Sequence, residues 1–572
     1  MKTLPFKTYQ ELFKSFTKSE NKYFLNYLFK GEYKNISTSL FKNKVLSLAK
    51  ELKNIGIKEN DTVAICAVSS PFWLIFDFAL HQIGAVSVPI FANISIKNLN
   101  FELNDANISY IFIDDKNTIK NIKKDLVFIT HTFEDSKNNF YCFDDLFYSN
   151  TLQQEIHADD IYKTNENDIF SIIYTSGNTG TPKGVVLSNK NIISQINDID
   201  FLIHLKKDEI ILSLLPLAHI FERTVMSYYL SKNVSIYFVD EITNVANLLK
   251  IVKPTMMTAV PRLLEKIYNK IKTNIESKPL ISKILASLAF SYAMRYDINK
   301  QGFIYKLFDK IVYIKFREIF GSRLQKLVSG GAPLNKDICN FFVNIGINIY
   351  QGYGLSEFSP VISTNAPDAQ KVGSCGKLLK SAEIKFLDKE ILVKGPSLMR
   401  EYLNQKELTK NTIDDEGWLH TGDIGHMDEE GYLYVSSRKK EIFKSSTGEY
   451  VNAVFLEQEL SKNKYIEFSI IIANNKKYVS ALLFVDKDKY LLEKQKNTDL
   501  SIEAYYANRS IINEIDKHIK KINKNLNSWE RIVKYTLILN DISIETGELT
   551  PSMKICRNKI EELYEDQIST MY

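Results

Sequence analysis

The stretch Ser171-Ile-Ile-Tyr-Thr-Ser-Gly-Asn-Thr-Gly-Thr-Pro-Lys-Gly-Val-Val-Leu-Ser188 places a loop of small residues and one lysine between two strand-like runs. Its glycines, Gly177, Gly180 and Gly184, permit backbone conformations that other residues resist, so successive N–H groups can point into one concavity. The loop also carries hydroxyls and a positive charge, on Thr175, Ser176, Thr179, Thr181 and Lys183. This combination predicts a binding site for a triphosphate.

The loop differs from the P-loop of nucleotide triphosphatases, in which Gly-Lys-Ser/Thr runs directly into a helix. Here Pro182 precedes the lysine, Gly184 follows it, and the β-branched run Val185-Val186-Leu187 continues the chain. We therefore predict a strand, the loop, a second strand, and only then a helix near Asn189. A loop without a ligand is the alternative for a short glycine pattern taken alone.

In its residue types and its predicted strand-loop-strand geometry, the stretch resembles the AMP-binding signature of the adenylate-forming (acyl-CoA synthetase) superfamily. The resemblance extends, motif by motif, over nearly the whole chain. It implies an α/β fold: a large N-terminal domain of two layered α/β subdomains plus a small distorted β-barrel, then a small α+β C-terminal domain. The implied domains are residues 1–436 and 437–572, with a hinge near Ser437.

The composition agrees with a globular protein of more than one domain, because the chain has 572 residues, 45% of them hydrophobic and 25% charged. The net charge of +5 is too small to indicate a nucleic acid partner. Five scattered cysteines, without paired spacing, predict reduced thiols in a cytosolic protein. The N-terminus lacks the pattern of a secretion signal, and the most apolar window, 71–92, predicts a buried helix followed by a buried strand.

The segments before and after the loop predict α/β layering. Residues 37–55 have helical spacing, while 62–68 and 110–114 have the character of short buried strands. Residues 211–223 predict a buried strand that ends in a polar cluster around His219. A lone histidine is more often structural. In long-chain acyl-CoA synthetases, however, a segment of similar sequence lies beside the substrate carboxylate, and this resemblance implies a site role for His219.

A basic region covers residues 262–326, with fourteen Lys and Arg against five Asp and Glu, interleaved with Tyr, Phe and Leu. A solvated face is the ordinary explanation of such a region. The alternative is a surface that rests on an anionic membrane, because basic amphipathic segments bind there by apolar burial and electrostatic attraction. We therefore expect a cytoplasmic protein, with peripheral association at the inner face of the membrane as the open alternative.

Two glycine-punctuated strand ends follow about twenty residues apart, Leu327-Val-Ser-Gly-Gly-Ala-Pro-Leu334 and Ile349-Tyr-Gln-Gly-Tyr-Gly-Leu-Ser-Glu357. Strand ends are where α/β sheets bind ligands. Tyr353 offers a flat apolar partner for adenine, and Glu357 offers a hard carboxylate for Mg²⁺. By resemblance, the nucleotide-binding positions here are Gly331, Ala332, Tyr353, Gly354 and Ser356, with Glu357 as the metal ligand.

Four further positions take their roles from the resemblance. Asp423 ends the run 415–423, which resembles the motif that holds the ribose hydroxyls, and Arg438 would be the ribose-contacting arginine of the interdomain junction. Gly448 lies in the thiolation loop. Lys554, within Gly547-Glu-Leu-Thr-Pro-Ser-Met-Lys-Ile-Cys-Arg557, would be the adenylation lysine, with an ordinary surface lysine as the alternative.

Three departures from the family pattern are visible. The junction residue before the arginine is commonly aspartate in long-chain members, but here it is Ser437. Glu401 stands where a glycine is usual, and Lys380-Ser381 replaces a Pro-Gly turn. None touches the implied chemistry directly, although Ser437 leaves the behaviour of the hinge open.

The resemblance implies ATP-dependent activation of a long-chain fatty acid to acyl-AMP, followed by transfer to coenzyme A, with Mg²⁺ as cofactor. Lys183, Glu357, Lys554 and His219 would be the catalytic residues. An acyl carrier protein as acceptor, no acceptor at all, and a medium-chain or aromatic acid ligase remain open. An inactive nucleotide- or lipid-binding protein is disfavoured because Lys183, Glu357, Asp423 and Lys554 are all present. The sequence predicts neither chain-length preference nor oligomeric state.

Overall fold

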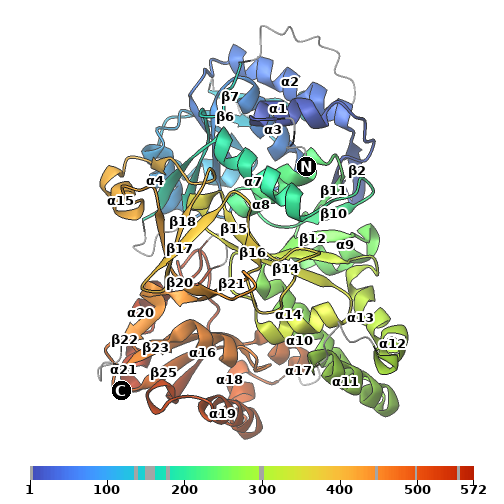
Figure 1. Cartoon of the computed structure of the whole chain (residues 1–572), viewed down its shortest axis with the longest axis vertical. Helices are drawn as coiled ribbons and strands as arrows, with labels where there is room; N and C mark the ends of the chain where they lie inside the picture. The colour runs from blue at the N-terminus through green and yellow to red at the C-terminus, as the bar shows by residue number, and fades with distance from the viewer. Residues whose placement is uncertain are drawn as a thin grey trace. The chain divides into compact units, whose positions relative to one another are not determined.

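The computed structural model describes residues 4, 6–133, 139–148, 162–175, 181–295, 302–444, 449–495, 499–550 and 554–572. The chain divides into two compact units. The first contains residues 1–385, 392–421 and 427–434, and the second contains residues 386–391, 422–426 and 435–572. Figure 1 shows the first unit from blue to yellow and the second mostly in orange and red. The predicted α/β class, with a large N-terminal and a smaller C-terminal part, is confirmed.

A nine-stranded sheet forms one half of the first unit, and the strands between β1 and β14 run parallel. Its order is β16 (Lys377–Leu378), β15 (Val361–Thr364), β14 (Asn348–Gly354), β13 (Lys326–Ser329), β12 (Met256–Ala259), β10 (Ile210–Ser213), β11 (Ser235–Phe238), β1 (Leu25–Phe29) and β2 (Glu32–Ile36).

An eight-stranded sheet forms the other half, parallel from β8 to β7 and antiparallel at β9 and β19. Its order is β19 (Glu401–Tyr402), β9 (Lys183–Ser188), β8 (Ile169–Thr175), β4 (Val86–Ile90), β3 (Thr62–Cys66), β5 (Tyr110–Ile113), β6 (Val127–Thr130) and β7 (Phe140–Cys142). The strands expected at 62–68 and 110–114 are confirmed.

Strand alternation explains how the eight-stranded sheet is covered on both faces. Val63 and Ile65 of β3 join the largest core, which also takes in residues of the nine-stranded sheet. Ala64 and Cys66 of the same strand join a separate core on the opposite face, beneath α4 (Ile96–Asp105). Because successive side chains of a strand point to opposite faces, one apolar run supplies two cores.

Helices between the two sheets fill the largest core: α1 (Tyr9–Phe16), α3 (Pro71–Gln82), α7 (Asn189–Leu202) and α8 (Ile220–Ser231), with α2 (Thr38–Asn54) against α3. All of α3 is buried, and it begins at the cap Ser70 with Pro71 in its first turn, where proline is favoured. The prediction of a buried helix and strand over 71–92 is therefore confirmed. No helix among the described residues is long and apolar enough to cross a membrane.

Further helices cover the outer face of the nine-stranded sheet and the remaining edges. They are α9 (Val245–Val252), α10 (Pro261–Glu276), α11 (Leu280–Arg295), α12 (Phe303–Phe308), a π-helix (Asp309–Tyr313), α13 (Ile314–Arg317) and α14 (Lys336–Asn344), with short α5 (Lys116–Ile119), α6 (Asp144–Tyr148) and α15 (Lys406–Thr412) elsewhere. A third sheet, of four strands, has the order β17 (Glu383–Leu387), β18 (Glu390–Lys394), β20 (Leu419–Met427) and β21 (Leu433–Arg438).

The second unit is built on a three-stranded sheet of β24 (Ile466–Ile472), β25 (Val479–Val485) and β26 (Ile532–Ile538), beside the pair β22 (Ile442–Lys444) and β23 (Tyr450–Asn452). Its helices are α16 (Ala453–Leu460), α17 (Lys487–Lys494), α18 (Ile502–Tyr506), α19 (Arg509–Asn523), α20 (Arg557–Leu563) and α21 (Glu565–Thr570). Each face of the three-stranded sheet carries its own core. Helix α19 places four isoleucines in one of them, which makes it amphipathic despite its polar composition.

Candidate active site

The glycine-rich loop joins two antiparallel strands, as predicted. Thr175 at the end of β8 and Lys183 at the start of β9 are direct cross-strand partners, so the loop closes a hairpin, and α7 follows at Asn189. Thr181 is described as well, whereas Ser176, Gly177, Thr179 and Gly180 lie outside the described residues. The site therefore begins with a lysine fixed at the base of the loop by strand pairing.

Tyr402 links this lysine to the predicted metal ligand. The Lys183 ammonium lies 5.4 Å from the centre of the Tyr402 ring, within the range of a cation–π contact. The Tyr402 hydroxyl donates a 2.6 Å hydrogen bond to Oε1 of Glu357. Burial raises the pKa of Tyr402, and the charge of Glu357 raises it further, so the hydroxyl keeps its proton. One side chain thus positions a cation and a carboxylate that lie far apart in the sequence.

Sequence reasoning did not identify Tyr402 as a site residue. It belongs to the two-residue strand β19, which pairs with β9 through Tyr402 and Val185. A tyrosine next to a turn carries no distinctive pattern. Its role depends on this pairing, which joins segments more than two hundred residues apart in the chain.

The two predicted strand ends meet at one edge of the nine-stranded sheet. Strands β13 and β14 are parallel neighbours, with Ser329 opposite Gln351. Gly331 and Ala332 follow the first of them, and Tyr353 and Gly354 end the second. Ser356 and Glu357 lie in the short 3₁₀ helix that comes next. The structure therefore brings the glycine-punctuated segments together, as the sequence predicted.

Gly354 is required by close packing of the backbone. A Cβ atom at this position would lie 1.8 Å from the carbonyl oxygen of Pro360, a distance that no side chain can tolerate. The end of β14 and the segment after the 3₁₀ helix therefore pack tightly against each other. This close packing fixes the position of the 3₁₀ helix that carries Glu357. The backbone N–H of Met399 donates to the carbonyl of Glu357 at 2.8 Å and holds the same turn from the other side.

His219 starts a helix, which differs from the expectation of a strand that ends in a polar cluster. Strand β10 stops at Ser213, and Nδ1 of His219 accepts a 3.1 Å hydrogen bond from the N–H of Phe221 as the cap of α8. The ring of Phe221 lies 3.0 Å from where a Cβ of Gly330 would be, beside the end of β13. The Pro216 turn before the histidine ends the strand, and a histidine cap starts the helix. His219 therefore lies two residues before Phe221, whose ring packs beside Gly330 after the end of β13.

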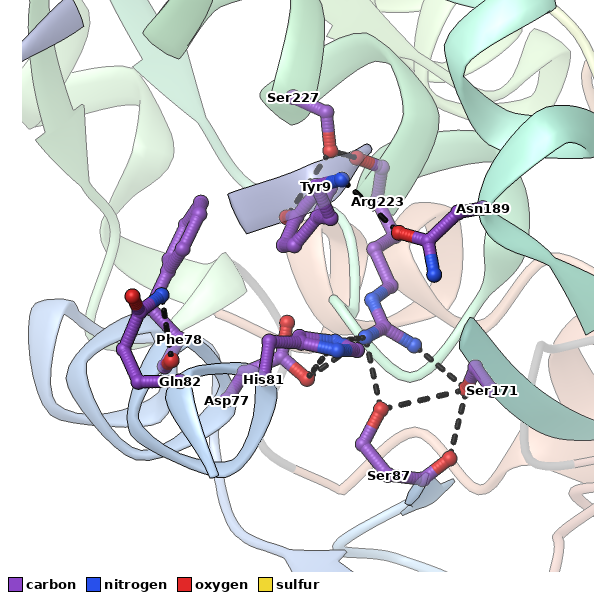
Figure 2. A network of polar contacts seen from close by, with 10 residues as sticks. All are labelled: Tyr9, Asp77, Phe78, His81, Gln82, Ser87, Ser171, Asn189, Arg223 and Ser227. Atoms are coloured by element: carbon purple, nitrogen blue, oxygen red, sulfur yellow. Dashed lines mark hydrogen bonds and ion pairs between the residues drawn. The ribbon is translucent and has the colours of Figure 1, made fainter. Parts of the chain in front are cut away.

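A buried polar cluster around Arg223 lies one turn further along α8 (Figure 2). The guanidinium donates to Asp77 of α3 at 2.6 Å, to Ser87 of β4 at 2.8 Å and to Ser171 of β8 at 2.7 Å. It also lies 4.2 Å from the centre of the Phe170 ring. Arg223 is 1% exposed, so this cluster joins two strands and two helices inside the core.

The charges in this cluster compensate each other. Burial alone raises the pKa of Asp77, but Arg223 and His81 outweigh it and hold that pKa below its usual value. Burial lowers the pKa of His81, against the attraction of Asp77. Asp77 is therefore an anion and Arg223 its cation. Because Ser171 begins the stretch that leads into the phosphate loop, the cluster anchors the root of that loop.

The two predicted ribose contacts lie side by side in the second unit. Nε of Arg438 is 2.9 Å from Oδ1 of Asp423, and the carboxylate is buried while the arginine is half-exposed. Lys439, directly after β21, pairs with the buried Glu390 of β18 at 2.6 Å. Strands β20 and β21 are neighbours, which brings the end of one motif to the start of the next. Ser437, the predicted hinge residue, is buried at the end of β21.

Lys554 lies in a tight backbone turn of the second unit. Its N–H donates to the Thr550 hydroxyl at 2.9 Å, and its carbonyl accepts from the Thr550 N–H at 2.8 Å. Three residues later, Arg557 pairs with the partly buried Glu457 at 2.5 Å and fixes the end of this segment. The side chain of Lys554 is exposed. Gly448 lies outside the described residues.

The chain is similar to known proteins over most of its length. The long-chain-fatty-acid–CoA ligase FadD15 of Mycobacterium tuberculosis is 29% identical over 563 residues, covering 95% of this chain and 93% of the relative. Long-chain-fatty-acid–CoA ligase 5 of Rattus norvegicus is 28% identical over 581 residues, covering 94% and 84%.

Among solved structures, the adenylation domain of a carboxylate reductase from Mycobacterium chelonae has a TM-score of 0.79 at 17% identity, covering 100% of this chain and 92% of that one. A Mycobacterium tuberculosis fatty acyl CoA synthetase has a TM-score of 0.63 at 19% identity, covering 98% and 99%. These likenesses show a shared fold. The model of the AMP-binding enzyme family matches residues 12–403, and the model of its C-terminal domain matches residues 440–572. The chain therefore belongs to the AMP-binding enzyme family.

Proposed function

We propose that this enzyme is a long-chain fatty acid–CoA ligase, which joins a fatty acid to coenzyme A at the expense of ATP and releases AMP and pyrophosphate. The observation that carries the proposal is the Lys183–Tyr402–Glu357 arrangement at the base of the phosphate loop, which combines a cation and a carboxylate as an ATP–Mg²⁺ site requires. The acyl class and the acceptor rest on the names of the relatives, which are long-chain-fatty-acid–CoA ligases. The similarity covers 93% and 84% of the length of these two relatives.

The first step is the attack of a fatty acid carboxylate oxygen on the α-phosphorus of ATP, with pyrophosphate as the leaving group. Lys183, with the hydroxyls and amides of the loop, holds the β- and γ-phosphates, and Lys554 offsets charge between the carboxylate and the α-phosphate. Tyr353 stacks on adenine, with Gly331, Ala332, Gly354 and Ser356 around it. Little covalent help is needed, because positioning and electrostatics dominate such transfers.

Glu357 fits the part of the Mg²⁺ ligand. Among the residues that the structure describes, no group of three or more His, Cys, Asp or Glu side chains could form a metal cage. Mg²⁺ in phosphate-transfer sites is usually held by one or two carboxylates with substrate phosphates and water, so one hard oxygen ligand is sufficient. When bound, the ion would neutralise charge on the phosphates. The hydrogen bond from Tyr402 fixes the carboxylate orientation for this role.

In the second step the thiol of coenzyme A attacks the acyl carbon and displaces AMP. Asp423 and Arg438 hold the ribose, since a carboxylate can accept hydrogen bonds from both vicinal hydroxyls. His219 lies beside the acyl carboxylate. The small domain, residues 437–572, rotates about Ser437 between the steps, so that Lys554 leaves and Gly448 and its neighbours line the pantetheine channel.

Separate assays of the two half-reactions test this division of labour. Lys554→Ala is expected to abolish ATP–pyrophosphate exchange and to leave thioester formation from supplied acyl-AMP largely intact. Lys559→Ala is the matched control, because Lys559 is a partly exposed lysine that lies five residues after Lys554. Equal loss of both half-reactions in Lys554→Ala would contradict the proposed roles.

The acyl class and the acceptor are tested by AMP release across fatty acids from short to long, with coenzyme A and an acyl carrier protein as competing acceptors. Long-chain acids with coenzyme A are expected to give the highest kcat/KM. A preference for carrier protein, or for aromatic acids, would replace the proposed substrate while leaving the adenylation step in place. None of the five cysteines, all of which the structure describes, forms a disulfide bond, which supports a reducing, cytoplasmic location as part of the proposal.

A further inference from the structure

In an ordinary surface helix the large apolar side chains face the protein core. In helix α11 the small apolar side chains face the core, and the large ones face outward. The buried side chains are small: Ala286, Ala289 and Ala293, spaced three and four residues apart. This inward face packs against α14, where Asn344 donates to the carbonyl of Ala293 at 2.7 Å. The large aliphatic side chains point outward instead, at Leu280, Ile281, Ile284, Leu285 and Leu288.

The next helical segment repeats this arrangement. From α12 through the π-helix to α13, the buried side chains are Tyr305, Val312, Tyr313 and Phe316, and the exposed ones are Phe303, Ile304, Leu307, Ile311 and Ile314. The two segments are neighbours, because the Tyr313 hydroxyl donates to the Ala289 carbonyl at 2.9 Å. Figure 1 shows α11, α12 and α13 together at the lower right edge of the first unit. We call the ten exposed apolar side chains of α11 to α13 the outer face.

The outer face concentrates apolar surface far beyond chance. The described residues expose 27 large hydrophobic side chains, and ten of them lie in the outer face, between residues 280 and 314. Ile281 and Phe303 are each 83% exposed. Single exposed apolar residues need no explanation, but a cluster of this size marks a binding surface.

Basic side chains surround the outer face. Lys278, Lys283, Lys306, Lys310 and Lys315 are all exposed within or beside the same helices. Two exposed carboxylates, Glu276 and Glu318, lie at the ends of this region, and Asp309 is paired with Arg317 at 2.6 Å, so the exposed lysines outnumber the unpaired acids. The surface is therefore apolar along the helices and cationic beside them, the pattern of helices that lie in the interface of an anionic bilayer.

We propose that the outer face of α11 to α13 is a membrane-binding surface that inserts its apolar side chains among the acyl chains of an anionic lipid bilayer. The lysines would contact the lipid headgroups while the aliphatic side chains lie just below them. A second copy of this chain is a poorer occupant, because two identical lysine-rich faces would repel each other. This proposal is independent of the ligase activity and concerns where the enzyme meets its lipid surroundings.

Cosedimentation of the full-length protein with vesicles tests the proposal. Vesicles of phosphatidylcholine with 30% phosphatidylglycerol are expected to bind the protein at low salt, more weakly at high salt, and pure phosphatidylcholine vesicles much more weakly. Ile284→Ser with Leu288→Ser is expected to lower the partition coefficient by about tenfold or more. The matched control is Ile251→Ser, which replaces a 60% exposed isoleucine of α9 outside the outer face and is expected to change nothing.

A charge series separates headgroup attraction from apolar insertion. Lys283→Gln with Lys310→Gln is expected to weaken binding to anionic vesicles by about thirtyfold at low salt, because each basic residue near such a surface contributes about fivefold. The control pair is Lys97→Gln with Lys120→Gln, both exposed elsewhere in the first unit. Thermal unfolding and ATP–pyrophosphate exchange verify that each variant remains folded.

Three outcomes would overturn the proposal. They are failure of the protein to bind anionic vesicles at low salt, binding that the outer-face substitutions leave unchanged, and a concentration-dependent dimer in sedimentation velocity, without lipid, that the same substitutions abolish. The last result would assign the outer face to a second copy of the chain. Loss of vesicle binding in the outer-face variants alone, with folding and pyrophosphate exchange retained, supports the membrane assignment.

Discussion

Replacement of Arg223 by methionine would remove the only guanidinium of the cluster in Figure 2 and leave Asp77 buried without its cation. Asp77 is 0% exposed, and one of its oxygens, Oδ2, already has no hydrogen-bond partner. Breaking a buried ion pair by removing one partner costs about 3–5 kcal/mol, because a charge is left in a medium that cannot solvate it. We expect Arg223→Met to lower the free energy of unfolding by that amount.

The double variant Asp77→Leu with Arg223→Met is the matched control. Replacement of a whole buried pair by apolar residues of similar volume is often neutral or stabilising. The second substitution is therefore expected to restore much of the lost stability, so the two changes are strongly non-additive. The hydroxyls of Ser87 and Ser171 lose their donor in both variants, so that part of the effect cancels.

Urea unfolding followed by tryptophan fluorescence measures these changes. The Trp73 ring lies 5.5 Å from the guanidinium carbon of Arg223 and reports on this core. In the wild type, the lowered pKa of Asp77 contributes stability that is present above pH 3.8, the usual value, and lost as pH falls through the folded pKa. In Arg223→Met burial is no longer opposed by the arginine, so the deficit relative to wild type should shrink as pH falls from 7 towards 4.

A deficit below about 1 kcal/mol, or two substitutions whose effects simply add, would refute this reasoning, because either result means that the pair is solvated or unimportant. Arg223→Met should also raise KM for ATP more than it changes the KM for coenzyme A, since Ser171 begins the strand that carries the phosphate loop. Equal change in both KM values would instead indicate a general loss of folded enzyme.

Burial raises the pKa of Glu222 to about 8, against 4.5 in the unfolded chain. The free energy of unfolding should therefore fall by about 1.4 kcal/mol for each pH unit as the pH rises between these values. The urea midpoints of Glu222→Gln should lack this dependence on pH. Tyr402→Phe keeps the ring against Lys183 but loses the bond to Glu357, so the Mg²⁺ concentration for half-maximal pyrophosphate exchange should rise about tenfold; an unchanged Mg²⁺ requirement would separate Tyr402 from the metal site. Gly354→Ala should prevent correct folding, as measured by soluble yield and exchange activity, whereas Gly31→Ala, which has positive φ but open space, should cost only about 1 kcal/mol.

Local patterns predicted the elements that depend on local chemistry. Glycines and β-branched residues around Lys183 predicted the hairpin, and the apolar window 71–92 predicted its helix and strand. The start of α8 at His219 was missed because the apolar run 211–218 continues past the true strand end, and only the turn at Pro216 breaks it. Tyr402 and Arg223 act through partners more than forty residues away, and no local pattern marks such pairs.

The outer face shows the same limit in another form. Helical spacing identifies which residues share a side of a helix, but it does not say which side meets the protein. For α11 the large aliphatic residues would be placed inward by the usual rule, whereas the alanines pack on α14. The basic composition of 262–326 was visible in the sequence, and the structure adds that its apolar residues are exposed beside the charges.

The pairing of β19 with β9 also determines when, during synthesis, the hairpin that carries the phosphate loop can complete its strand pairing. Strand β9 ends at Ser188, and its outer edge pairs with β19 and the residues on either side of it, Arg400 to Leu403. At about 5–20 residues per second, the ribosome needs roughly ten to forty seconds to make the intervening chain. During that interval the hairpin has an open strand edge, which is a template for pairing with other chains. A nascent chain that stalls before residue 401 would therefore be aggregation-prone, even though its signature loop is complete.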